Sequence, residues 1–302
     1  MIERSEGGGE ATPILDLRTH NTLREYGAST ETVSRGWRWV IRRYSGSYTE
    51  CCGSYIECGD HKNGTGNSER EKKERATLIS QLSEEDIERS LRRTRKTVRQ
   101  KLLMIKPDKL LTFTTRHAFV ETDEFKRVVS LFFKLCRKNN LQFQYVAVFE
   151  RHMSKKTALK KFGSLHMHLA TSGFVDYVVV RKLWRDSVFR FLKNDYEGSN
   201  FDSRANKRGL HSKKNAAVRI ARYMSKYITK DIDDIEYRAN QKRYWSSKGI
   251  KEPEKVVIYT KSSQDHQIFK LMMSDIFGVE FVKFFAPDKQ PGAPPIIWMA
   301  TA

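Results

Sequence analysis

Strand-like and helix-like hydrophobic patterns follow one another through the middle of the chain. Residues 110–115 alternate between apolar and polar side chains, as a half-buried strand does. Residues 123–138 carry apolar side chains at the spacing of an amphipathic helix, with Thr122 as its cap and Asn139–Asn140 at its end. Further along, the pattern predicts strands at 142–151 and 164–171 and a helix at 176–192.

The order strand, helix, strand, strand, helix indicates the fold class. The two middle strands are joined by a loop and can pair antiparallel, which fits a split β-α-β sandwich of the ferredoxin or RNA-recognition type. We therefore expect an α+β fold with a central antiparallel sheet. Helices would cover one face of this sheet, and the other face would hold the active site.

A basic helix is predicted just before this core. Ser83 is its N-cap candidate, and acidic residues follow in the first turn. Its apolar stripe consists of Ile87, Leu91, Val98 and Leu102. We expect its basic side chains to contact the DNA backbone, with a solvated charged face as the alternative: Arg92, Arg93, Arg95, Lys96 and Arg99.

Composition divides the chain into three parts. Residues 1–80 are expected to form an accessory, partly flexible region with a strand near 36–41 and a polar linker at 60–75. Residues 81–260 contain the patterned core and are expected to form the catalytic domain. Residues 261–302 would form a C-terminal extension or tail.

The net charge indicates an anionic partner. The 302 residues include 56 Lys and Arg against 36 Asp and Glu, a formal net charge of +20. Nucleic-acid phosphates are the leading partner for such an excess. No apolar run approaches the roughly 18 residues that a membrane helix needs, and no secretory signal is visible at the N-terminus. We therefore expect a cytoplasmic protein without a membrane partner.

The four cysteines do not indicate a disulfide framework. Cys51, Cys52, Cys58 and His61 could in principle bind zinc, but their spacing fits no common ligand pattern. Cys136 lies on the apolar face of the predicted helix at 123–138 and is expected in the core.

Two histidines share one face of a predicted strand. His166 and His168 are two residues apart, so their side chains point to the same side, opposite the apolar residues between and around them. Glu150 ends the preceding strand, which should pair with this one. Two imidazoles and a carboxylate form a ligand set that suits Mn²⁺ and tolerates Mg²⁺. A salt bridge of Glu150 to Arg151 or Lys161 is the alternative.

A tyrosine pair lies on a predicted helix at 216–230, which Asn215 can cap. Its small and apolar residues cluster on one side, and two tyrosines and two lysines cluster on nearly the opposite side: Tyr223, Lys226, Tyr227 and Lys230. Because a phenol has an ordinary pKa of about 10, it is a weak nucleophile at neutral pH. Neighbouring ammonium groups favour the phenolate, and a metal ion polarises a phosphate, so the set is suited to attack on a phosphodiester.

Three segments in this order resemble the motifs of HUH endonucleases: Leu111–Thr115, His166-Met167-His168 and Tyr223-Met224-Ser225-Lys226-Tyr227. The resemblance is closest to the two-tyrosine rolling-circle replication initiators of single-stranded DNA phages and plasmids. The basic segment from Arg243 to Gly249 also resembles one that follows the tyrosine helix in phage members, and Arg243 and Lys248 are expected to contact DNA.

The resemblance implies a metal-dependent enzyme that nicks and rejoins single-stranded origin DNA. A 5′-phosphotyrosine would form on Tyr223 or Tyr227, and a free 3′-hydroxyl would prime synthesis. Lys226 and Lys230 would support the nucleophiles, and one Mg²⁺ or Mn²⁺ would be bound by His166, His168 and Glu150. The chain has no P-loop motif, so helicase and polymerase would be separate host proteins in a bacterial cytoplasm.

Two alternatives stay open at this point. A relaxase or transposase would use the same chemistry on another substrate. A non-enzymatic nucleic-acid-binding protein on the same fold would instead expose aromatic side chains on its central strands, with Phe113 and Tyr145 as candidates.

Overall fold

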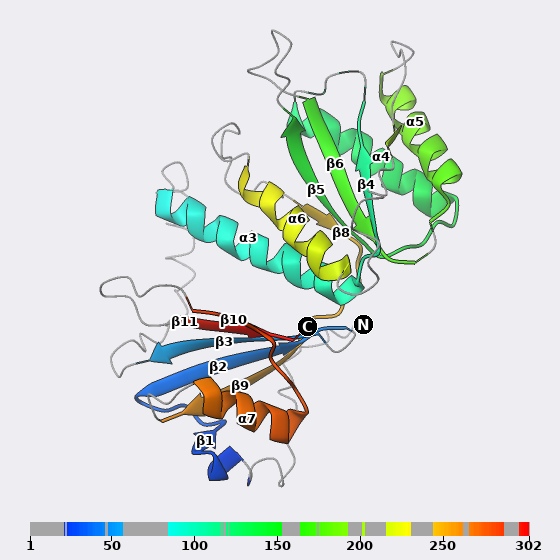
Figure 1. The fold of residues 1–302 in the computed structure, drawn as a ribbon. Helices are drawn as coiled ribbons and strands as arrows, with labels where there is room; N and C mark the ends of the chain where they lie inside the picture. Colours follow the sequence, from blue (N-terminus) through cyan, green and yellow to red (C-terminus); the bar gives the residue numbers. More distant parts are fainter. Residues whose placement is uncertain are drawn as a thin grey trace, which may run out of the picture. The chain divides into compact units, whose positions relative to one another are not determined.

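The chain divides into two compact units, which Figure 1 shows as ribbons. We call residues 69–252 the central unit and residues 1–68 with 253–302 the terminal unit. This computed structural model describes residues 21, 23–45, 48–56, 84–115, 117, 119, 121–152, 164–173, 175–192, 201–202, 216–230, 244–261, 266–286 and 296–301.

The central unit contains a five-stranded sheet in which every neighbouring pair is antiparallel. In spatial order its strands are β7 (Phe201–Asp202), β4 (Lys109–Phe113), β6 (Ser164–Thr171), β5 (Tyr145–His152) and β8 (Tyr244–Ser246). The first four strands follow the order expected of a split β-α-β sandwich, and β8 extends the sheet at its edge. The predicted α+β fold class is confirmed.

Two helices cover one face of this sheet, as the sequence predicts. Figure 1 shows α4 (Thr122–Lys138) and α5 (Tyr177–Leu192) side by side against it. Their apolar faces pack on the alternate side chains of β6, which are Leu165, Met167 and Leu169. The indole nitrogen of Trp184 also donates to the carbonyl of Thr114 at 3.1 Å, which ties α5 to the end of β4.

The second face of the sheet also carries helices. Helices α3 (Glu84–Ile105) and α6 (Ala216–Lys230) pack against each other, and both contact β5. The reason is that α6 has an apolar side of its own, whose members are buried: Val218, Ile220, Ala221, Met224 and Ile228. The predicted site face is therefore bordered by α6 rather than bare.

Some element ends differ from the prediction. Thr122 is the first residue of α4 and Glu121 is its N-cap, without a side-chain hydrogen bond. Asn139 ends the helix as predicted, and its side-chain amide donates to the carbonyl of Leu135 at 2.8 Å. Strand β5 begins at Tyr145, three residues later than expected. The predicted caps Ser83 and Asn215 lie outside the described residues.

The terminal unit contains a six-stranded antiparallel sheet and one helix. The strands in spatial order are β1 (Ala28–Ser29), β9 (Glu254–Thr260), β2 (Gly36–Arg43), β3 (Thr49–Ile56), β11 (Ile296–Ala300) and β10 (Lys283–Phe285). Helix α7 (His266–Phe277) packs on one face, where the Trp39 and Phe269 rings stack with centroids 4.0 Å apart.

This sheet changes the predicted division of the chain. Strand β9 lies inside the predicted catalytic segment but pairs with β2 of the N-terminal region. Strands β10 and β11 lie in the predicted C-terminal tail, yet β11 pairs with β3. The boundaries at 80 and 260 are therefore not those of the compact units, because backbone pairing joins segments that are distant in the chain. The predicted linker at 60–75 lies outside the described residues.

Two further sequence expectations concern cysteines and membranes. Cys51 and Cys52 are neighbours on β3, so their side chains lie on opposite faces of the sheet and cannot bind one ion together. Burial raises the pKa of the Cys51 thiol well above its ordinary value and that of Cys136 to about 12. Among the described residues, no helix has the length and apolar character needed to cross a membrane.

The packing of Trp39 on Gly53 can be tested by adding one methyl group. A Cβ at Gly53 would lie 2.3 Å from the Trp39 ring. We expect Gly53→Ala to lower the free energy of unfolding by about 1–3 kcal/mol, because the indole must shift away from Phe269. Denaturant unfolding followed by tryptophan fluorescence measures this, with Ser54→Ala as the control on the opposite face. Equal stability of both variants would contradict this packing.

Candidate active site

His168 lies at the centre of the candidate site because of its place in the sheet. Strand β6 runs between β4 and β5, and the register sets His168 directly opposite Thr112 on one side and Val148 on the other. The side chains on either side of it in sequence point into the α4–α5 core, so its imidazole points to the opposite face. It is only 5% exposed.

Both ring nitrogens of His168 have hydrogen-bond partners. Nε2 lies 2.8 Å from Oε2 of Glu150, and Nδ1 lies 3.1 Å from the hydroxyl oxygen of Thr112. Glu150 is the diagonal neighbour on β5, a position that a long side chain can reach from. An ionised carboxylate only accepts, so Nε2 carries a proton and the neutral ring accepts at Nδ1 from Thr112. The Glu150 carboxylate thus faces His168.

The two tyrosines of α6 lie against this histidine. The Tyr227 ring stacks on the His168 ring, with centroids 4.6 Å apart and planes at 15°. The Tyr223 ring meets His168 edge-on at 6.2 Å and Tyr227 edge-on at 5.0 Å. Since residues four apart share one side of a helix, a single orientation of α6 brings both phenols to the site.

Access to the site differs between these side chains. Tyr223 is 42% exposed, whereas Tyr227 is half-buried and Glu150 is buried. Lys226, which lies between the tyrosines in sequence, is exposed on α6. The side chain of Lys230 lies outside the described residues. The site therefore combines a buried imidazole–carboxylate pair with a phenol that an external substrate can reach.

The third predicted metal donor is close in register but belongs to a different row. His166 lies on the same face of β6 as His168 and directly opposite Glu150 on β5. Within the described ranges, no three His, Cys, Asp or Glu side chains approach closely enough to form a metal cluster. Two of the three predicted donors, His168 and Glu150, meet directly, and they are of the kinds that a divalent cation accepts.

A third phenol lies on the same face of the sheet. Tyr244 on β8 is opposite Val148, so both side chains lie on the His168 side, whereas Trp245 packs into the α4–α5 core. Burial raises the pKa of Tyr244, which keeps this phenol neutral at physiological pH. Tyr244 thus provides a protonated counterpart to the α6 tyrosines.

The predicted DNA-contacting residues are mostly on the surface. On α3, Arg92, Arg93, Arg95 and Lys96 are exposed and Arg99 is half-buried. Arg92 forms an ion pair with Glu88 one turn earlier, at 2.9 Å. Lys248 is exposed just after β8, and Arg243 lies outside the described residues.

The aromatic residues considered for a non-enzymatic binding surface are not available for it. Phe113 is fully buried in the α4–α5 core. Tyr145 stacks on Phe133 of α4, with ring centroids 4.2 Å apart. Both side chains lie on the helix-covered face, because they alternate with the residues that face His168. The structure therefore rules out these two residues as stacking platforms.

Thr112 is a site residue that the sequence reasoning missed. It belongs to the motif Leu111–Thr115, but no role was inferred for its hydroxyl. A signal for it exists in the alternation of β4, where Thr112 is the polar residue between the buried Leu111 and Phe113. Its contact with His168 depends on the register between β4 and β6, which the sequence alone does not reveal.

The central part of the chain matches a known family. Residues 108–232 match the model of a family described as replication-associated protein ORF2. The matched segment includes β4, both histidines, Glu150 and both tyrosines of α6. No curated protein and no solved structure matches the chain. The family match supports a replication-associated protein of the initiator kind, with DNA as its partner.

The hydrogen bond from Thr112 should determine which nitrogen of His168 carries the proton. Thr112→Val keeps the shape and removes the hydroxyl, so Nδ1 loses its partner. We expect the tautomer populations of His168 to change in ¹⁵N NMR spectra of the imidazoles, while His117, which is exposed, keeps its signals. Unchanged His168 signals would contradict a positioning role for Thr112.

Proposed function

We propose that this protein initiates replication by nicking and rejoining single-stranded DNA at an origin through a covalent phosphotyrosine. One observation carries the proposal: two phenols of α6 and the His168–Glu150 pair of the sheet lie together on one face. The match of residues 108–232 to a replication-associated family supports the same conclusion independently.

In the proposed reaction a tyrosine oxygen attacks the scissile phosphorus. A P–O bond to the tyrosine forms, the P–O3′ bond breaks, and the departing 3′ oxygen takes up a proton to become a 3′-hydroxyl. The 5′ phosphate stays on the enzyme as a diester, so the reverse attack by a 3′-hydroxyl reseals the strand without another energy source. The free 3′-hydroxyl primes synthesis for rolling-circle replication.

Tyr223 and Tyr227 are the proposed nucleophiles. Tyr223 is accessible from solvent, and Tyr227 is held by stacking on His168. With two phenols 5.0 Å apart between ring centroids, a second attack can take place while the first tyrosine still holds a DNA end. Lys226 and Lys230 would provide positive charge that favours the phenolate and the phosphate.

We propose that one divalent cation, Mg²⁺ or Mn²⁺, is bound by His168, Glu150 and His166. The His168–Glu150 pair has the nitrogen and oxygen donors that such an ion accepts, and His166 extends from the same face of β6. When bound, the ion would polarise a non-bridging phosphate oxygen and stabilise the charge that develops on it. Thr112 would then accept a hydrogen bond from Nδ1 of His168 while Nε2 is a ligand, which is a common way to orient such a histidine.

The remaining DNA contacts are assigned to the basic surface of the central unit. The exposed side chains of α3 would bind phosphates and position the strand: Arg92, Arg93, Arg95 and Lys96. Arg99, Arg243 and Lys248 are further proposed contacts. Strand separation and synthesis would be performed by a separate helicase and polymerase of the host.

Substitution of both tyrosines should abolish the covalent adduct. The protein would be incubated with Mn²⁺ and single-stranded oligonucleotides that tile the genetic element carrying its gene, and adducts would be detected on a denaturing gel. We expect Tyr223→Phe with Tyr227→Phe to bind DNA but form no adduct, because phenylalanine keeps the ring stacking and lacks the attacking oxygen. Tyr244→Phe, which alters the neutral phenol on the same face, should still form it. Adduct formation by the double variant would overturn the nucleophile assignment.

Removal of a proposed metal ligand should lower both ion binding and cleavage. We expect Glu150→Gln and His166→Ala each to reduce Mn²⁺ affinity in calorimetry and to slow cleavage by about 100-fold or more, with an unchanged circular dichroism spectrum. His117→Ala is the matched control, since this histidine is exposed on a loop of the same unit. Normal Mn²⁺ binding by His166→Ala would exclude it as the third ligand.

A further inference from the structure

The sheet of the terminal unit has a second face that α7 does not cover. Helix α7 packs on the side chains of Trp39, Cys51, Ile258 and Met299. Because side chains alternate along a strand, their immediate neighbours lie on the opposite face, which we call the open face. The register arranges the open face in three rows across the strands.

Each row consists of directly opposed residues. The first row is Ser29, Tyr259, Arg38, Ser54 and Ile296. The second row is Val257, Val40, Cys52, Trp298 and Phe285. The third row is Lys255, Arg42, Glu50, Ala300 and Lys283.

The charge of the open face is predominantly positive. Lys255 is exposed, and the other basic members, Arg38, Arg42 and Lys283, are half-buried. The one acidic member of the three rows, Glu50, is buried, and its carboxylate oxygens accept hydrogen bonds from the hydroxyls of Tyr44 and Tyr48. Four cations therefore face outward over an area where the single carboxylate is already engaged, which favours an anionic ligand.

Aromatic side chains stand between these cations. Phe285 is 60% exposed, and Trp298, directly opposite it, and Tyr259 are half-buried. Partly exposed rings in a basic surface are the combination on which unpaired bases stack while their phosphates contact Lys and Arg. A duplex keeps its base faces stacked inside, so this arrangement fits a single strand better than a double helix.

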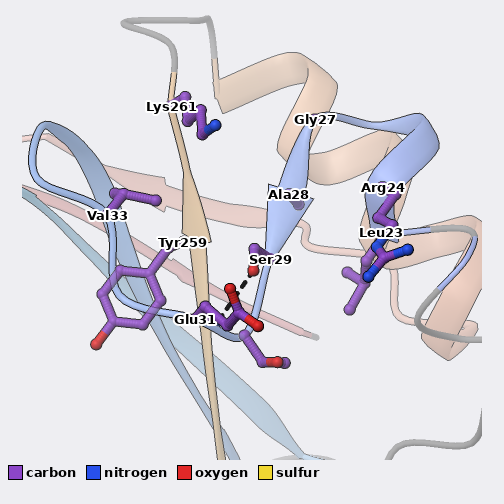
Figure 2. Close-up of a pocket in the computed structure, with 10 residues that line it drawn as sticks. Leu23, Arg24, Gly27, Ala28, Ser29, Glu31, Val33, Tyr259 and Lys261 are labelled. Atoms are coloured by element: carbon purple, nitrogen blue, oxygen red, sulfur yellow. Dashed lines mark hydrogen bonds between the residues drawn. The ribbon is translucent and has the colours of Figure 1, made fainter.

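A pocket adjoins the first row at the β1–β9 edge. It has a volume of about 440 Å³, and its lining includes Ser29, Glu31, Val33, Tyr259 and Lys261. Figure 2 shows Tyr259 beside Val33, with Ser29 and Glu31 joined by a hydrogen bond from the Glu31 amide to the Ser29 hydroxyl. The pocket thus provides polar groups next to a ring that already belongs to the open face.

We propose that the open face of the terminal unit binds single-stranded DNA. Its cations would contact successive phosphates, and Tyr259, Trp298 and Phe285 would stack on bases. DNA rather than RNA is assigned because the central unit matches a replication-associated family. This surface is separate from the proposed nicking reaction, since it uses neither the tyrosines of α6 nor a metal ion.

The test compares two pairs of charge-removing substitutions in the full chain. Arg38→Gln with Arg42→Gln removes two charges from the open face. Arg43→Gln with Lys270→Gln removes two from the α7 side, where Arg43 lies over the Phe277 ring and Lys270 over the Phe284 ring. The probe is a fluorescein-labelled 30-nucleotide mixed-sequence DNA strand, and its binding is followed by anisotropy over a range of salt concentrations. A third variant, Trp298→Leu, tests stacking without a change in charge.

We expect the open-face pair to weaken binding about tenfold more than the α7-side pair and to lower the salt slope by about 1.4, the value for two fewer phosphate contacts. Trp298→Leu should weaken binding several-fold with an unchanged slope. Equal effects of the two pairs, or a loss confined to an RNA strand of the same sequence, would overturn the proposal. Adduct formation at saturating oligonucleotide should persist in the open-face pair, so the result is independent of the nicking mechanism.

Discussion

The position of β6 between β4 and β5 is the constraint on which the candidate site depends. This antiparallel register brings a threonine, a histidine and a glutamate from three strands into one hydrogen-bonded chain, Thr112–His168–Glu150. Both nitrogens of a buried imidazole are thereby engaged, which restricts its rotation. A shift of either strand pair by one residue would turn His168 or its partners into the α4–α5 core. The pairing of the strands thus determines whether the site exists.

The two faces of the central sheet have different roles, and each role depends on the other. On one face α4 and α5 form an aromatic-rich core with Phe113, Phe132 and Trp184 in mutual contact, which makes the sheet a stiff support. On the other face α6 packs through its apolar side and α3, so that its tyrosines are held against His168 rather than left on a mobile loop. A stiff sheet and a packed helix together keep phenols and imidazole within a few ångströms, which covalent chemistry on a phosphate requires.

The positive charge of the chain is distributed over surfaces with different partners in their immediate surroundings. On α3 the basic side chains are exposed on a long helix, where contact with a phosphate backbone needs no base recognition. On the open face of the terminal sheet they alternate with Tyr259, Trp298 and Phe285, which suits contact with unstacked bases. A protein that nicks a single strand benefits from both kinds of contact, since one positions the strand and the other retains it.

Sequence periodicity by itself determined the α+β class, the helices at 122–138 and 216–230, and the common side of the two tyrosines, because these follow from local alternation and helical repeat. It also placed the His168 side chain opposite the core. Tertiary structure alone decided that Thr112 and Glu150 engage His168 and that Tyr227 stacks on it, since cross-strand register and helix orientation are not local properties. It also decided that strands from both chain ends share one sheet, because backbone pairing between distant segments leaves no signal in the hydrophobic pattern of either one.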